Sequence, residues 1–288
     1  MKKSLLIAAS CLAVLGVATA CAPVQILNTI TPSSSFERDR NISYGELERQ
    51  KLDIYRAEAP KAGAPVLVFV HGGSWDSGSK DIYKFLAEGF TSEGYDVVVP
   101  NYRLWPEVKY PDFVTDTAEA IAFTASKFEG RPLVVMGHSA GGYNSLLSVM
   151  KPEFYPGGLE AACGSIAGMV SLAGPTGIVA LGSEPFISIF PERMFGDDAP
   201  MNNVSGPMPP VFFAHGADDT TVYPQNSQFL AEKIKKRGGQ ADIKIYDGLG
   251  HIKIIQVISR HFDGGETVKS DIISFVESLD LTRSNFCR

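Results

Sequence analysis

The stretch Gly137-His138-Ser139-Ala140-Gly141-Gly142 has the residue types of a nucleophilic turn. A short apolar run over residues 132–136 precedes it, and a helical pattern over 143–150 follows it. In the order strand, Gly-x-Ser-x-Gly, helix, a sharp turn lifts the serine hydroxyl above the sheet, and the glycines let strand and helix pass close together. The helix N-terminus behind the turn favours developing negative charge. Since the short pattern also fits an ordinary Gly/Ser turn, the prediction that Ser139 is a nucleophile depends on the flanking elements.

A serine hydroxyl needs a base to take its proton, and histidine has the pKa for this task near neutral pH. In proteins with this turn, the chain order is serine, then an acid, then histidine. Of the five histidines, only His251 and His261 leave room for an acid after the serine. His251 ends a glycine-rich loop directly after a predicted strand, whereas His261 lies in a polar stretch that predicts a surface position. His251 is therefore the predicted base.

The acid is expected just after a strand, in the segment 215–222, which reads His-Gly-Ala-Asp-Asp-Thr-Thr-Val. Asp219 is favoured because it has the spacing His-Gly-x-x-Asp-x-x-Val, and it would hold the imidazole of the base in the required tautomer. Asp218 is then expected in solvent, and Asp247 stays as a third candidate. Two further histidines are expected to fix loops by hydrogen bonds: His138 and His215.

The loop His71-Gly72-Gly73-Ser74-Trp75 follows an apolar run over residues 66–70. An oxyanion needs two or more fixed N–H donors, and glycines let the backbone approach a bound carbonyl closely. A tight turn alone would explain one glycine here but not two beside a histidine. The predicted oxyanion donors are the backbone amides of Gly73, Ser74 and Ala140.

Strand and helix patterns alternate from residue 42 to residue 279. The helices are predicted from apolar residues at helical spacing, and the strands from apolar runs. Strands are predicted near 42–44, 51–55, 66–70, 95–102, 133–136, 166–172, 210–214 and 241–246, and helices over 81–93, 112–127, 143–150, 226–237 and 268–279. This alternation predicts an α/β fold, with a mostly parallel central sheet and helices on both faces. Ligands in such sheets bind beyond the carboxyl ends of the strands. The stretch 174–208 has no clear period and predicts a small lid insertion.

The N-terminus predicts export. Met1-Lys2-Lys3 is followed by an apolar run over residues 5–20 that is too short to span a membrane comfortably, which indicates a signal peptide over residues 1–20. The end of this run, Ala-Thr-Ala-Cys, resembles a bacterial lipobox in which Cys21 is lipidated, and it also fits an Ala-x-Ala signal peptidase site. We favour the lipobox, because a cysteine directly after the cut would otherwise be a coincidence. The expected location is the cell envelope, on its periplasmic face or in the outer membrane; the alternative is a periplasmic or secreted protein.

The rest of the chain is expected to form one domain. A Pro-Ser-Ser-Ser core predicts a flexible tether within residues 21–41, followed by the folded domain over 42–281 and a tail over 282–288. An oxidising compartment would allow Cys163 and Cys287 to pair, but the sequence does not show whether they approach each other, so this disulfide stays open.

Composition and charge narrow the classes of partner. The chain has 44% hydrophobic and 20% charged residues, as in an ordinary soluble globular protein. Its formal net charge is -6 and its one short basic cluster lies at 233–237, which argues against a nucleic-acid partner. No cysteine or histidine spacing resembles a zinc site, and the predicted chemistry needs no metal or cofactor. The expected partners are a small acyl ester and a membrane reached only through a lipidated N-terminus; the oligomeric state stays open.

Together, these motifs resemble the α/β-hydrolase superfamily on its esterase and lipase side. The chain is similar, over roughly residues 42–279, to carboxylesterases and kynurenine-formamidase-like hydrolases that carry a His-Gly-Gly-x-Trp loop. The matching segments, in the expected order, are 71–75, 101–104, 137–142, 215–222 and 250–251. Ser74 departs from the hormone-sensitive-lipase-like branch, which has a third glycine and a substantial N-terminal cap, and this departure favours a small acyl substrate. Arg103, in the second segment, is expected to make a buried ion pair.

The resemblance implies a serine esterase in which Ser139 attacks, His251 moves the proton and water resolves the acyl-enzyme. Trp75, Phe186 and Phe190 are expected to shape the acyl pocket, with plain core packing as the alternative. An amidase, a formamidase or a sugar deacetylase would use the same triad. A lipid-anchored binding protein that keeps a hydrolase fold is the interpretation from another class, and its sequence mark would be a broken triad.

Overall fold

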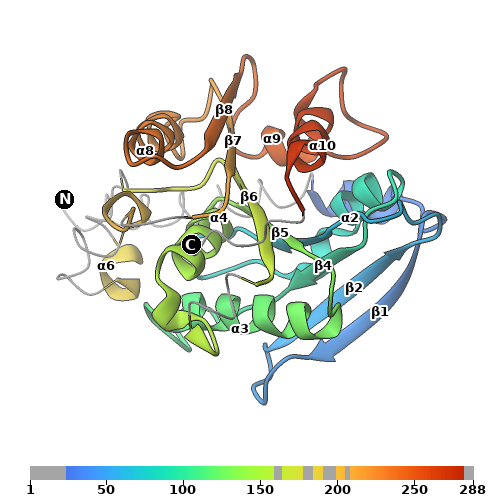
Figure 1. The fold of residues 1–288 in the computed structure, drawn as a ribbon, viewed down its shortest axis with the longest axis horizontal. Helices are drawn as coiled ribbons and strands as arrows, with labels where there is room; N and C mark the ends of the chain where they lie inside the picture. The colour runs from blue at the N-terminus through green and yellow to red at the C-terminus, as the bar shows by residue number, and fades with distance from the viewer. Residues whose placement is uncertain (1–23, 159–163, 178–183, 191–198, 205–207, 282–288) are drawn as a thin grey trace, which may run out of the picture.

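In the computed structural model, the described residues are 24–158, 164–177, 184–190, 199–204 and 208–281. They hold a mixed sheet with helices on both faces (Figure 1). The strands are β1 Phe36–Ser43, β2 Lys51–Ala57, β3 Val66–Val70, β4 Val97–Pro100, β5 Leu133–His138, β6 Ile166–Leu172, β7 Val211–Gly216 and β8 Ala241–Tyr246.

The order of the strands is β1-β2-β4-β3-β5-β6-β7-β8. β2 is antiparallel to both β1 and β4, and every neighbouring pair from β4 to β8 is parallel. β3 and β5 are buried along their whole length, because a strand covered on both faces must be apolar throughout. The structure confirms the prediction of a mostly parallel sheet.

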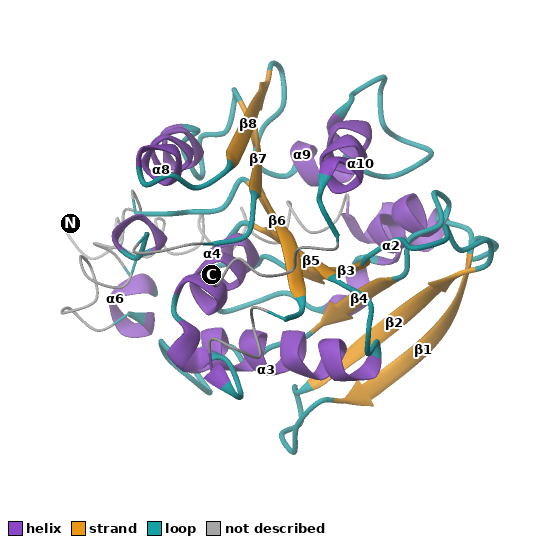
Figure 2. Ribbon diagram, in the orientation of Figure 1, coloured by secondary structure: helices purple, strands orange, loops and turns teal. Residues whose placement is uncertain are grey.

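Helices cover the two faces in separate groups (Figure 2). The helices are α2 Lys84–Thr91, α3 Asp112–Lys127, α4 Ala140–Met150, α6 Phe186–Ile189, α8 Gln225–Lys236, α9 Lys253–Gln256 and α10 Val268–Ser278, with 3-10 turns η1 Lys80–Ile82, η2 Pro152–Phe154 and η3 Pro200–Asn202. α2, α9 and α10 share one apolar cluster with Leu67 and Phe69 of β3, whereas α3, α4 and α8 share another with Val66 and Val68. The alternation of side chains along β3 therefore divides the core into two layers.

Most predicted elements agree with the structure, and the differences lie at their ends. The predicted helix 81–93 is two pieces, η1 and α2, which meet at Tyr83. The predicted strand 95–102 is shorter, with β4 limited to Val97–Pro100. The four-residue α9 is too short to leave a helical period in the sequence, so the sequence analysis missed it.

The tether is where the sequence-based expectation needs correction. Residues 24–30 form a helix, and β1 begins at Phe36, so much of the stretch 21–41 is part of the fold rather than a spacer. Phe36 is buried and its ring meets Tyr55 edge-on with centroids 5.0 Å apart, and this packing outweighs the flexible composition before it. The described fold therefore starts at residue 24 rather than 42.

Several predicted features lie outside the described residues: Cys21, Cys163, Cys287, the tail 282–288 and parts of the stretch 174–208. The described parts of that stretch include α6 and η3. None of the helices within the described ranges has the length and hydropathy needed to cross a bilayer.

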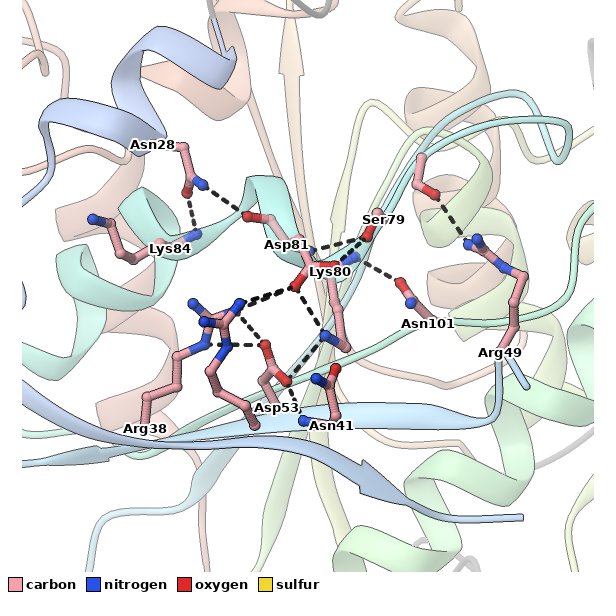
Figure 3. A network of polar contacts seen from close by, with 12 residues as sticks. Asn28, Arg38, Asn41, Arg49, Asp53, Ser79, Lys80, Asp81, Lys84 and Asn101 are labelled. Carbon is pink, nitrogen blue, oxygen red and sulfur yellow. Dashed lines mark hydrogen bonds and ion pairs between the residues drawn. The ribbon is translucent and has the colours of Figure 1, made fainter. Parts of the chain in front are cut away.

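A buried group of charges joins the first two strands to the segment after β3 (Figure 3). Asp53 of β2 has no exposed side-chain surface, and it accepts hydrogen bonds from Arg38 Nε at 3.0 Å and from the backbone N–H of Asn41 at 2.8 Å. Lys80, only 1% exposed, places its Nζ 3.1 Å from Asp53 Oδ1. Charges this deeply buried are stable only when paired, so Asp53 fixes both cations in place.

We expect Asp53→Asn to lower the free energy of unfolding by about 3 kcal/mol, because the buried Lys80 and Arg38 then keep only the half-exposed Asp81 as a shared counter-charge. Urea unfolding followed by circular dichroism measures the difference. Glu232→Gln is the matched control, since it breaks an exposed pair with Lys236 and should leave the midpoint unchanged within error. Equal midpoints for the two variants would show that the buried network does not stabilise the fold.

Candidate active site

Ser139 sits on a strained turn between β5 and α4. Its φ of 53° and ψ of -124° lie outside the usual regions for a residue with a side chain, at a cost of about 1–3 kcal/mol. A Cβ on Gly137 would lie 2.3 Å from the carbonyl oxygen of Gly141, and one on Gly141 would lie 2.2 Å from that of Val70. The glycines are therefore required because strand and helix pass in contact. Ser139 N–H donates to the Leu172 carbonyl at 3.0 Å, which secures the turn to β6.

The predicted nucleophile, base and acid form one chain of hydrogen bonds. His251 Nε2 lies 2.8 Å from Ser139 Oγ, and His251 Nδ1 lies 2.7 Å from Asp219 Oδ2. Because a carboxylate only accepts, the imidazole proton is on Nδ1, and Nε2 is left free to accept from the serine hydroxyl. The three side chains follow β5, β7 and β8, all at the carboxyl edge of the parallel sheet.

The Asp219 carboxylate is 2% exposed and surrounded by donors. Its Oδ1 accepts from the backbone N–H groups of Thr221 and Val222, each at 2.9 Å, and His215 Nε2 lies 3.2 Å from Oδ2. Burial by itself raises the pKa of Asp219, but the hydrogen bonds from His215 and His251, together with the backbone donors, outweigh it and hold the pKa well below its usual range. Asp219 is therefore a permanent negative charge beside the base.

The side chains of Asp218, Asp247, His138 and His261 are not part of this chain of hydrogen bonds. Asp218 and Asp247 are exposed. His138 Nε2 lies 2.9 Å from the His251 carbonyl oxygen, and burial, followed by the nearby His251, lowers the pKa of His138 to about 3. His138 is therefore neutral and donates to that carbonyl, which fixes the loop of the base. His261 is partly exposed on the surface, as predicted.

His215 has a closer relation to the acid than the sequence suggested. Its Nδ1 lies 2.7 Å from Ser227 Oγ, and its Nε2 lies 2.7 Å from the Val222 carbonyl oxygen as well as 3.2 Å from Asp219 Oδ2. A proton on Nε2 can be donated to the Val222 carbonyl and the Asp219 carboxylate, both of which only accept, and the Ser227 hydroxyl can bond to Nδ1. His215 thus holds both the acid and the loop that carries it.

The loop after β3 has the backbone shape of an oxyanion site. Three successive residues have positive φ: Gly73 at 127°, Ser74 at 52° and Trp75 at 63°. A Cβ on Gly72 would lie 3.1 Å from Ser139 Cβ, so this backbone lies against the nucleophile. The N–H groups of Gly73 and Ser74 have no acceptor among the described residues. With the N–H of Ala140 at the first position of α4, they are the three predicted donors, and their role stays a prediction.

Long-range bonds hold this loop in its strained shape. Trp75 Nε1 donates to Asn144 Oδ1 of α4 at 2.8 Å, and the Trp75 carbonyl accepts from the N–H of Trp105 at 2.8 Å. Arg49 Nη2 donates to the Gly78 carbonyl at 3.0 Å at the far end of the loop (Figure 3). The sequence analysis missed Asn144, whose one signal is an amide in a largely apolar helix. Through it, the loop is tied to the helix that follows the nucleophile.

The three predicted pocket residues belong to one aromatic cluster. Trp75 and Phe190 are buried, with ring centroids 4.8 Å apart and planes nearly perpendicular. Phe186 meets Trp75 edge-on at 6.2 Å and keeps part of its surface exposed. Packing therefore accounts for the burial of Trp75 and Phe190, and a role for the three in shaping a pocket stays a prediction.

The ion pair expected for Arg103 is confirmed. Arg103 Nη2 lies 2.8 Å from Asp116 Oδ1, and its backbone N–H donates to Asp116 Oδ2 at 2.8 Å. The Asp116 side chain is fully buried in α3. This pair fixes the segment after β4 against α3.

Comparisons with known proteins match this chain to relatives whose names describe ester hydrolases. The BD-FAE family model matches residues 52–234, a stretch that includes Ser139 and Asp219 and ends before His251. The chain is 24% identical over 269 residues to the "Probable isoprenylcysteine alpha-carbonyl methylesterase ICME" of Oryza sativa, covering 84% of this chain and 64% of the relative. It is 30% identical over 231 residues to the "Probable carboxylic ester hydrolase LipM" of Mycobacterium tuberculosis, covering 70% of this chain and 52% of the relative. The chain thus spans less than two thirds of the length of these two relatives.

Among solved structures, esterase B from Lactobacillus rhamnosis superposes with a TM-score of 0.76 at 15% identity, and the match covers 96% of each chain. At this identity the likeness concerns the fold alone. It extends over nearly the whole chain, so it includes the strands that carry the three side chains.

Asp219→Asn should lower the stability of the fold at neutral pH, and the difference from wild type should shrink in acid. The folded-state pKa of Asp219 lies below its unfolded value of about 3.9, so its stabilising contribution is complete above that value. The contribution declines as pH falls toward the folded-state pKa. Urea unfolding at pH 7 and at about pH 3, below the unfolded value, measures the effect, with the exposed neighbour variant Asp218→Asn as the control. A difference that grows on acidification would contradict the bonding described for Asp219.

Proposed function

The chain belongs to the BD-FAE family and has the α/β-hydrolase fold, and from this premise we propose that it is a serine hydrolase of carboxylic esters with short acyl groups. The observation that carries the proposal is the hydrogen-bonded chain from Ser139 through His251 to Asp219. The esterase names of the relatives support the same chemistry.

In the proposed reaction, Ser139 Oγ attacks the ester carbonyl carbon while His251 Nε2 takes its proton. The negative charge of Asp219 stabilises the imidazolium that forms. The oxyanion accepts hydrogen bonds from the amides of the loop after β3 and of Ala140, and each such donor contributes about 2.7–4 kcal/mol to the transition state. The tetrahedral intermediate collapses, and His251 protonates the departing alcohol.

Water completes the cycle. His251 takes a proton from a water molecule, which attacks the acyl carbon on Ser139, and the second tetrahedral intermediate releases the carboxylic acid and the serine. The preference for short acyl groups is supported by the resemblance at Ser74, where the hormone-sensitive-lipase-like branch has a third glycine.

Ser139→Ala is expected to reduce kcat for p-nitrophenyl acetate by about 10⁴- to 10⁶-fold and to abolish labelling by a fluorophosphonate probe. His251→Ala should cause a loss of similar size, and the double variant should be no worse, since the two residues act as one unit. His261→Ala is the matched control and should retain full activity. Substantial hydrolysis by Ser139→Ala would contradict the proposal.

A panel of p-nitrophenyl esters and amides defines the substrate class. Acetate and butyrate esters should give higher kcat/KM than the octanoate ester, and the corresponding anilides should react more slowly than the esters. Faster cleavage of anilides would indicate an amidase that uses the same triad.

We also propose that the protein is located in a bacterial cell envelope, attached by a lipid on Cys21. The basic start, the apolar run over residues 5–20 and the cysteine directly after it support this location. The attachment would bring ester hydrolysis to a membrane surface.

Mass spectrometry of the mature N-terminus tests the attachment. We expect processing before Cys21 and a diacylglyceryl group on its sulfur, because the residue becomes the N-terminus once the signal is removed. The Cys21→Ser chain is the control and should carry no lipid. A mature wild-type chain with a free Cys21 thiol would favour the ordinary signal-peptidase site.

A further inference from the structure

The helix over residues 24–30 is fixed to the domain by one of its faces. Val24 and Leu27 are buried in the core cluster with α2. Asn28 makes two bonds to the backbone: its Nδ2 donates to the Asp81 carbonyl at 2.7 Å, and its Oδ1 accepts from the N–H of Lys84 at 2.6 Å (Figure 3). The helix therefore lies in a set position over the start of α2.

The opposite side of this helix is apolar and exposed. Ile26 is 62% exposed and Ile30 is 54% exposed. Their spacing of four residues puts them on the same side of the helix. Because Val24 and Asn28 hold the helix to the domain, this exposed pair of isoleucines has a fixed direction.

A loop from the other end of the chain carries a third exposed apolar side chain to the same place. Phe262, in the loop after α9, is 50% exposed. Its neighbours Arg260 and His261 lie 3.7 Å and 4.0 Å from Oε1 of the buried Glu88. Glu88 belongs to α2, one helical turn after the residue that Asn28 contacts. A single helix, α2, thus supports both the N-terminal helix and the loop.

The N-terminal helix and the loop after α9 line an open groove of about 390 Å³. Its apolar wall consists of Ile26, Leu27, Ile30, Val257 and Phe262. Lys253, Asp263 and Glu266 also line it, one positive and two negative groups, so the face carries no strong charge of one sign. Apolar side chains that gather on one face of a domain indicate an interaction surface, whereas single scattered ones do not.

We propose that Ile26, Ile30 and Phe262 form a membrane-docking face, whose side chains insert among the lipid head groups of a bilayer. The position of the face in the chain argues for a lipid partner. The first described residue, Val24, follows Cys21 by three positions, and three residues of extended chain reach about 10 Å at most. A lipid on Cys21 would therefore hold this face within contact of the bilayer.

A diacylglyceryl group on Cys21 would itself attach the chain, because two acyl chains hold a protein stably on a membrane. The three exposed apolar side chains, on their rigid support, would then decide which face of the domain lies against the bilayer. Since the charged groups of the groove sum to only -1, attachment through this face depends little on salt. The proposal rests on the lipid attachment proposed for Cys21 and does not depend on the hydrolytic activity of the domain.

Tryptophan fluorescence in vesicles tests the orientation. The full chain carrying Phe262→Trp is reconstituted in phosphatidylcholine vesicles brominated near the head-group end of the acyl chains, where bromine quenches tryptophans that insert. Phe229→Trp on α8 is the matched control, because Phe229 is 49% exposed and α8 covers the opposite face of the sheet. After subtraction of the wild-type signal, quenching at position 262 should exceed that at 229 by about threefold or more, as expected for a ring in the interface.

A second substitution on the same face separates docking from anchoring. Ile30→Asp added to Phe262→Trp should reduce the quenching to the level of the control. Leu47→Asp, at an exposed residue outside this face, should not. Thermal unfolding verifies that each variant is folded, independently of ester hydrolysis. Equal quenching at 262 and 229 would overturn the proposal. So would a dimer that forms without lipid and is lost in Ile30→Asp, because the face would then bind a second copy of the chain.

Discussion

A single buried negative charge, that of Asp219, constrains how the catalytic edge of this protein can be built. The carboxylate receives two backbone N–H groups from its own loop, one imidazole N–H from His251 and a close contact from His215. Each donor compensates a charge that would be costly to bury alone. Because the donors come from the loops after β7 and β8, satisfying this charge also brings the two loops together. His138, at the end of β5, then fixes the carbonyl of His251, so the orientation of the base is determined from both sides.

The nucleophile and the loop beside it add a second constraint, which is backbone strain held by rigid surroundings. Ser139, Ser74 and Trp75 all have positive φ, a conformation that side chains disfavour. It persists because the glycines let β5, α4 and the loop meet in contact and because Asn144 ties the Trp75 indole to α4. At its far end the same loop leads into Lys80, which is locked by Asp53. The strain at the site is thus maintained by contacts that extend to the first two strands.

The sequence predicted the parts of this arrangement that depend on chain order and local pattern. Ser139 was found from a turn motif, His251 from the required order of a triad, and the strands from apolar runs; the structure brings the three triad side chains together. The sequence could not predict the hydrogen bond between Trp75 and Asn144 or the ion pair between Asp53 and Lys80. Contacts between residues tens of positions apart leave no periodic signal in a sequence. The prediction of a flexible tether was wrong for a related reason. Its composition predicted flexibility, but packing of Phe36 on a ring from β2 decides its structure.

The position of β8 in the sheet affects how the site loses its arrangement on heating. β8 lies at the edge and pairs with β7 alone, and part of its length is exposed, whereas β5 is flanked by β3 and β6. Edge elements open with less free energy than the centre of a fold. An opening limited to β8 would withdraw His251 while the nucleophile and the interior strands stayed paired. The three side chains would then separate at a temperature below the melting temperature of the domain, because the opening of one edge strand, and not global unfolding, would set that temperature.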